Sequence, residues 1–126
     1  MRVLVTGDRD WNDAVLIESH LKKLPKDTLI IQGGARGADT LAKQAAHRLG
    51  LEVETYKADW KRYRKAAGPI RNRQMLKEGK PDRGLAFHDN IENSKGTKDM
   101  VAVLRKAGVP VELIGHKRED RSVENV

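Results

Sequence analysis

The sequence predicts an α/β fold in which about five parallel strands form one sheet with helices on both faces. Two observations carry this prediction. Short apolar runs that end at glycine or at a polar loop alternate with longer segments in which apolar residues recur every three or four positions. Strands and helices that alternate in this way form a parallel sheet covered on both sides. The chain has 126 residues, the size of one ordinary domain.

The first half of the chain contains three apolar runs and two segments of helical period. Strands are predicted over residues 2–6, 28–32 and 52–56, and helices over residues 14–24 and 39–49. Pro25 ends the first helix because proline cannot continue it. Asp39 is the expected N-cap of the second helix, and Gly50 ends it.

The second half begins with a stretch, residues 57–67, that has no clear period. Gly68 and Pro69 then open a helix, since proline is tolerated in a first helical turn. Further strands are predicted over residues 84–87 and 109–114, and a last helix over residues 97–107. Residues 116–126 are charged and poor in apolar residues, so we expect a flexible tail after a domain of residues 1–115.

The positive charge of the chain is concentrated in one segment. The 25 Lys and Arg residues exceed the 18 Asp and Glu residues, for a formal net charge of +7. Residues 57–83 hold ten of the basic and three of the acidic residues, which is the whole excess. A uniformly basic coat for nucleic acid is therefore not expected, and one basic segment on a neutral domain needs an explanation.

Composition excludes several classes of protein and site. The chain has no cysteine, so it has no disulfide, no thiolate metal site and no cysteine nucleophile. Its four histidines are far apart in sequence, and we expect neither a metal site nor a cofactor. No apolar stretch is long enough to cross a membrane, and none resembles a signal peptide. We therefore expect a cytoplasmic protein with no membrane partner.

The glycine-rich loop GGARGAD, residues 33–39, lies between a strand and a helix. Its glycines let the backbone approach a ligand and point amides at an anion. The following helix N-terminus and Arg36 add positive charge. The loop matches neither the P-loop nor the GxGxxG motif, and tight packing of strand on helix explains the glycines equally well.

Three further loops at strand or helix ends are candidates for the same site. Residues 94–97, SKGT, precede a helix and offer either free amides for an anion or a plain N-cap. Arg9 suits a phosphate, whereas Trp11 either stacks on a base or packs in the core. Arg71 and Asn72 lie near a helix N-terminus, where an anionic ligand would offset the unfavourable position of the arginine. His88 follows the fourth strand and is a weaker candidate for proton transfer.

Residues 60–65, WKRYRK, interleave aromatic and cationic side chains. This pattern is typical of sites for single-stranded nucleic acid, in which bases stack and phosphates pair with cations. The alternative is a solvated loop with Trp60 folded onto the domain. In the nucleic-acid hypothesis, the residues that contact the strand are Trp60, Lys61, Arg62, Tyr63 and Arg64.

These motifs, in this order, resemble a known family. The strings are VTGDRDW, GGARGAD, ADW, AGPIRNRQM and SKGTKDM, and they span residues 1–115. Together they resemble the YspA-type, YpsA-related domains of the SLOG superfamily, the Smf/DprA and LOG group of bacteria and phages. The resemblance implies a Rossmann-like fold that binds a nucleotide or a nucleotide-derived small molecule, as a sensor or a processing domain. Relatives often dimerise, so a homodimer is an expected state.

The resemblance also implies which residues line the ligand site. By motif position these are Gly7, Arg9, Gly33, Gly34, Arg36, Gly37, Asp39, Arg71, Asn72, Ser94, Lys95, Gly96 and Thr97. LOG relatives cleave the N-glycosidic bond of nucleoside monophosphates, and DprA relatives bind single-stranded DNA.

One departure from the LOG motif bears on the enzymatic alternative. LOG enzymes have PGGxGTxEE where this chain has NSKGTKDM, so the acidic pair becomes Asp99 and Met100. Cleavage of an N-ribosidic bond needs a carboxylate near the ribose. Asp39 and Asp99 are the candidate catalytic residues, and binding without catalysis is the leading hypothesis. Nucleic acid is a partner that the resemblance allows and the charge distribution does not favour.

Overall fold

A computed structural model describes residues 1–116 as one five-stranded parallel sheet with helices on both faces, which confirms the predicted fold class. The strand order is β3-β2-β1-β4-β5. The strands are β1 (Arg2–Gly7), β2 (Leu29–Gln32), β3 (Glu52–Thr55), β4 (Arg83–Phe87) and β5 (Val111–Ile114). The longer helices are α1 (Ala14–Leu21), α2 (Ala38–Arg48), α4 (Ala67–Gly79) and α5 (Gly96–Lys106).

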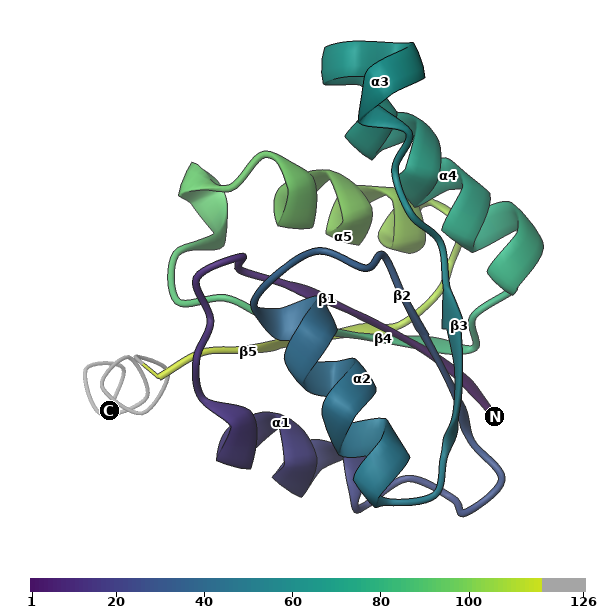
Figure 1. The fold of residues 1–126 in the computed structure, drawn as a ribbon, viewed down its shortest axis with the longest axis vertical. Helices are drawn as coiled ribbons and strands as arrows, with labels where there is room; N and C mark the ends of the chain where they lie inside the picture. Colours follow the sequence, from purple (N-terminus) through teal and green to yellow (C-terminus); the bar gives the residue numbers. More distant parts are fainter. Residues whose placement is uncertain (117–126) are drawn as a thin grey trace.

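Successive residues of the central strands face opposite sides of the sheet, so each strand serves two cores. Val3 and Ile30 face α1 and α2, whereas Leu4 and Ile31 face α4 and α5. Figure 1 shows the two helix pairs on opposite sides of the strands. The central strands β1, β2 and β4 are buried on both faces, which explains why they appear in the sequence as continuous apolar runs, whereas the edge strands β3 and β5 are partly exposed.

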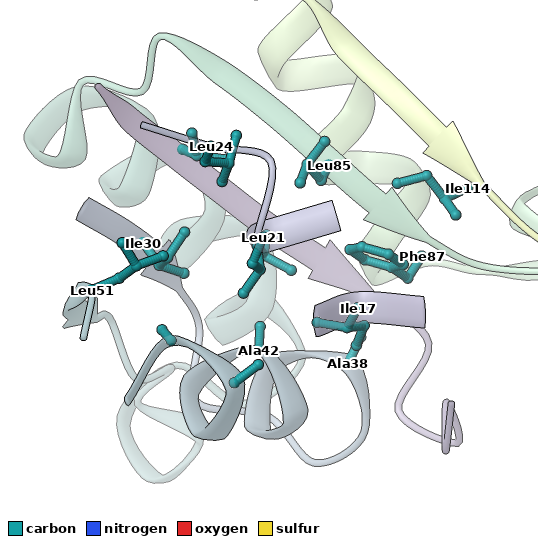
Figure 2. Close-up of a cluster of buried hydrophobic side chains, with 14 of the residues drawn as sticks. Ile17, Leu21, Leu24, Ile30, Ala38, Ala42, Leu51, Leu85, Phe87 and Ile114 are labelled. Carbon is teal, nitrogen blue, oxygen red and sulfur yellow. The ribbon is translucent and has the colours of Figure 1, made fainter. Parts of the chain in front are cut away.

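The core beneath α1 and α2 is built from aliphatic side chains around two aromatic ones, Phe87 and Trp11. Phe87 at the end of β4 is fully buried, and Ile17 and Leu21 of α1 pack near it (Figure 2). The fully buried residues that α2 contributes to this core are alanines, among them Ala38 and Ala42, and Leu41 packs against the core while partly buried. Small side chains let α2 lie close to the sheet, and this fixes the position of the loop that precedes it.

The segment without a predicted period contains two short helices. Asp59 caps α3 (Trp60–Tyr63) by accepting a hydrogen bond from the amide of Arg62 at 3.1 Å. A 3-10 turn (Arg64–Ala66) joins α3 to α4. Helix α4 begins at Ala67, so Pro69 lies in its first turn as the sequence predicts. In Figure 1, α3 projects beyond the N-terminal end of α4.

His116 closes the described part of the chain against the sheet. Its ring stacks on Trp11 at 4.6 Å between centroids and lies within 3.0 Å of Asp89 Oδ1 and 2.8 Å of Asp13 Oδ2. The hydrogen bonds to these two carboxylates raise the pKa of His116. The rest of the predicted flexible tail, residues 117–126, lies outside the described residues.

Candidate ligand-binding site

A cavity of about 690 Å³ lies at the carboxyl ends of β1 and β4. The chain leaves β1 towards β2 and β3 on one side and returns to β4 and β5 on the other. In sheets of this kind ligands bind at that reversal of strand order, because the loops diverge there. The lining residues come from the loops after β1, β2 and β4, from the starts of α4 and α5, and from α3 with the 3-10 turn: Gly7, Asp8, Arg9, Asp10, Arg36, Trp60, Lys65, Pro69, His88, Asn93, Ser94, Lys95, Gly96 and Thr97.

The cavity lining is positive. Arg9, Arg36, Lys65 and Lys95 contribute four cations against the two carboxylates of Asp8 and Asp10. Arg36 lies 3.4 Å from Asp10, but both side chains are largely exposed and their ion pair is weak. Neither lysine has a carboxylate partner within residues 1–116.

Helix α5 points its first turn at this cavity. The N-cap position of α5 is Lys95, which makes no side-chain capping bond, and the amide of Thr97 donates to Ser94 Oγ at 3.0 Å. In the described part of the chain, the amides of Lys95 and Gly96 donate to no protein acceptor. Unpaired amides at a helix start attract anions, and the Lys95 side chain adds a full charge there.

The glycine-rich loop, residues 33–39, is held by its own carboxylate. Asp39 Oδ2 accepts hydrogen bonds from the amides of Gly33 at 3.0 Å and Ala35 at 3.3 Å. The amide of Gly34 donates to Gln32 Oε1 at 2.6 Å. Most amides expected to face a ligand phosphate are thus used within the protein. The predicted N-cap was wrong, because the N-cap of α2 is Gly37 and the Asp39 carboxylate instead binds amides that precede Gly37.

Asp39 is 6% exposed and lies beside Arg71. Burial raises the pKa of the Asp39 carboxyl to about 6, although the amide of Ala35, the Arg71 charge and the amide of Gly33 each lower it. Arg71 donates to the carbonyl oxygen of Gly33 at 2.7 Å. A Cβ on Gly33 would lie 2.3 Å from Arg71 Nη1 and 3.0 Å from Asp39 Oδ2, so a side chain at this position would displace the Arg71 guanidinium.

Buried Asn72 links α4 to the start of α5. Its amide nitrogen donates to Asp99 Oδ2 at 3.0 Å and to the carbonyl of Gly96 at 3.3 Å, and its oxygen accepts from Arg71 Nε at 3.1 Å. Arg73 binds both oxygens of Asp99, at 3.1 and 3.3 Å. Asn72 therefore positions Arg71 and the α5 turn.

A smaller cavity of about 230 Å³ adjoins the larger one, and Arg9 and Trp60 line both. Its other lining residues are Gly33, Gly34, Ala35, Lys57, Ala58 and Arg71. Three cations and no carboxylate line this smaller space.

The structure brings most of the predicted ligand residues to these two cavities, while their role in binding stays a prediction. Four do not line either cavity: Trp11, Gly37, Asp39 and Asn72. Trp11 is 5% exposed and packs edge-on against Phe87 in the core. Of the two candidate catalytic residues, Asp39 is enclosed by its loop, and Asp99 lines only a shallower hollow of about 640 Å³ beside the larger cavity.

Sequence reasoning did not assign Asp8, Asn93 or Lys57 to the site. Asp8 directly follows a strand, and Asn93 directly precedes the SKGT loop. Ligand sites in parallel sheets lie at strand ends and helix starts, so these positions could have been used to predict Asp8 and Asn93 as site residues.

Comparison with known proteins agrees with this architecture. The sequence profile of the YspA, cpYpsA-related SLOG family matches residues 1–63, half of the chain. The chain belongs to this family. The Gene 61 protein of Mycobacterium phage D29, a relative, is 37% identical over 125 residues, which cover 92% of this chain and 98% of that protein.

The fold of this SLOG protein is also that of DNA processing protein A (DprA) from Streptococcus pneumoniae. The X-ray structure of DprA matches with a TM-score of 0.72 over 89% of this chain, at 19% sequence identity. The SLOG chain spans about half, 49%, of the DprA chain. Within residues 1–116 there is no helix that is both long and apolar enough to cross a membrane.

Proposed function

We propose that this SLOG protein binds a phosphate-bearing nucleotide or nucleotide derivative in the larger cavity, as a sensor or a processing domain. Family membership supports a role related to nucleotides or nucleic acids, without specifying the ligand. The observation that carries the finer proposal is the cavity itself, which combines four cations and the open amides of α5 at the reversal of strand order. Its volume of about 690 Å³ lies within the range of small-molecule sites, about 300–1,000 Å³.

In this proposal, the phosphate of the ligand binds at the start of α5. Lys95 and the amides of Lys95 and Gly96 lie at that position, and Arg9, from the loop after β1, lines the same cavity. Hydrogen bonds to charged groups contribute about 1.5–3 kcal/mol each, more than neutral ones. The glycine-rich loop contributes shape, because its own carboxylate already occupies several of its amides.

A thermal-shift screen with nucleotides, nucleotide sugars and cyclic dinucleotides tests this function. A ligand that binds only the folded protein raises the melting temperature, and the rise grows with its concentration. We expect at least one class to stabilise the protein at about 1 mM, where even a weak ligand is detectable. If none of them does, the proposal is wrong.

Removal of the Lys95 side chain should weaken the ligand found by that screen. We expect Lys95→Ala to raise its Kd by roughly 10- to 100-fold, as titration calorimetry would measure, because one charge-assisted contact is lost. Arg105→Ala is the matched control, since Arg105 lies in the last turn of the same helix. Equal Kd values for the Lys95 variant and wild type would contradict the proposed phosphate position.

The enzymatic alternative has no observation in its favour. Neither Asp39 nor Asp99 lines the larger cavity, and Asp99 is held by Arg73 and Asn72. N-glycosidic hydrolysis therefore remains a prediction from the sequence, and binding without catalysis is the better account of this geometry.

Single-stranded nucleic acid is a second candidate partner because α3 exposes two aromatic rings. Trp60 is 47% and Tyr63 36% exposed, and Arg62 lies over the Tyr63 ring at 5.0 Å. The protein that shares the fold is named a DNA processing protein. Helix α3 is short and projects from the domain, so a single strand of nucleic acid has access to it (Figure 1).

This second candidate predicts binding of a short oligonucleotide that weakens steeply with salt, as phosphate contacts do. Alanine at both Trp60 and Tyr63 should cost about 1–3 kcal/mol per stacked base, measured by fluorescence anisotropy. Val15→Ala is the control, since Val15 is an exposed apolar residue of α1, 80% exposed. Unchanged affinity in the double variant would remove this mechanism.

A further inference from the structure

The chain has two tryptophans, and only one is available to a ligand. Trp11 is 5% exposed and is enclosed by Phe87 and His116, with its ring nitrogen donating to the carbonyl of Asp13 at 3.0 Å. Trp60 is 47% exposed and lines both cavities. The aromatic surface that faces the ligand space is therefore that of Trp60, although Trp11 lies in the motif that first suggested a stacking role.

The Trp60 ring is held in place from two sides. The Arg9 guanidinium lies over the ring, 5.3 Å from its centroid. On α4, a Cβ built at Gly68 would touch Trp60 Cη2 at 3.4 Å, so the ring lies against this glycine. Asp59 fixes the start of α3, from which the side chain emerges. A ring positioned in this way loses little conformational freedom when a ligand binds.

The surroundings of Trp60 select the chemistry of what binds to it. Arg9 lines both cavities, Lys57 and Arg71 line the smaller one, and Lys65 and Lys95 line the larger one. An exposed aromatic ring between groups of cations suits a ligand with one flat aromatic part and at least one anionic part. A nucleobase carrying a phosphate has this composition, and bases stack on tryptophan whatever their identity.

We propose that Trp60, held by Arg9, is the nucleobase-stacking residue of the ligand site and sets its preference for base-bearing phosphates over base-free ones. The inference rests on the proposed function, since it assigns the base to Trp60 and the phosphate to the start of α5. The aromatic contact with the base and the charge contacts with the phosphate can therefore be tested separately, with ligands that have or lack a base.

Matched ligands that differ by the base alone provide the test. AMP and ribose 5-phosphate form one such pair, and ADP and pyrophosphate provide a second comparison. Titration calorimetry should show AMP binding more tightly than ribose 5-phosphate to the wild type, by about 5- to 100-fold, the range expected of one stacked base. Trp60→Leu should abolish this ratio and leave the ribose 5-phosphate affinity within about twofold, because the cations remain. Trp60→Phe should restore most of the ratio, because phenylalanine keeps an aromatic face.

Intrinsic fluorescence gives a second readout that a merely structural role would not move. AMP should quench the wild-type emission, and the quenching should vanish in Trp60→Phe while calorimetry still records binding, because the remaining Trp11 is buried. A Trp60→Leu variant that binds both ligands as wild type does, or loses both equally, overturns the inference and leaves the phosphate site standing. If the wild type binds none of the four ligands, this inference is wrong, whereas the proposed function is still decided by the thermal-shift screen with nucleotide sugars and cyclic dinucleotides.

Discussion

Replacing Gly37 by alanine is expected to lower the free energy of unfolding by about 3 kcal/mol or more, or to prevent folding. Gly37 adopts φ 76° and ψ −127°, a conformation that is costly for residues with a side chain. A Cβ there would also lie 2.4 Å from the carbonyl carbon of Arg9 and 2.4 Å from the carbonyl oxygen of Asp8. Both are backbone atoms, so the loop after β1 would have to move away from α2. Urea denaturation measures the loss.

Gly50→Ala is the comparison at a positive φ without a clash. Gly50 has φ 74°, nearly that of Gly37, but no atom lies within 4 Å of a Cβ built there. We expect this variant to lose about 1 kcal/mol, the cost of a positive φ alone. Equal losses in the two variants would show that the contact between residue 37 and the loop after β1 contributes nothing to stability.

The second large effect is expected at Asp39. Asp39→Ala leaves the amides of Gly33 and Ala35 without their acceptor and Arg71 without the nearest opposite charge. Each buried donor left unpaired costs about 1–3 kcal/mol, so we expect a total loss of about 3 kcal/mol in urea denaturation at neutral pH. Asp39→Asn is the matched variant, because its amide oxygen can still accept both hydrogen bonds. It should lose clearly less than the alanine variant, and the reverse order would contradict this account.

Asp39 should also make stability depend on pH. Its pKa is about 6 in the folded chain and 3.8 as the reference value, so the folded protein holds a proton there that the unfolded chain has lost. The contribution of Asp39 to stability therefore falls as pH rises from about 4 to 6 and stays low above that range. The full change is about 3 kcal/mol, from 1.36 kcal/mol for each pKa unit. Asp39→Asn should remove this slope, and an identical pH profile in the variant would refute the raised pKa.

The fold could be predicted from sequence because its three central strands, β1, β2 and β4, are buried on both faces. Residues such as Leu4 and Ile31 read as parts of short apolar runs, and each run ends where the parallel strand ends. The positions of glycine and proline predicted the ends of the helices to within a few residues of those in the structure. Helix α3 was not predicted, since four residues are too few to show a helical period.

The site was harder to predict because its details depend on contacts distant in sequence. Local pattern favoured Asp39 as a cap, whereas its carboxylate instead serves amides four and six residues earlier. Which tryptophan is buried depends on β4 and on His116, far along the chain from Trp11. The spacing of residues along the sequence does not reveal such pairings. Charge and glycine content therefore predicted residues that line the two cavities, but not the contacts that each residue makes.

The central position of β1 has a consequence for how the domain folds. Its neighbour β4 pairs Val3 with Arg83 and Gly7 with Phe87, so the cavity walls after these strands meet only when segments about 80 residues apart have joined. Contacts of such long sequence separation form slowly, because much chain must be ordered first. The first 63 residues, which carry the family signature, hold three strands and only one wall of the cavity. If the proposed nucleotide site exists, the affinity it gains during refolding would therefore report when the second half of the chain docks on the first.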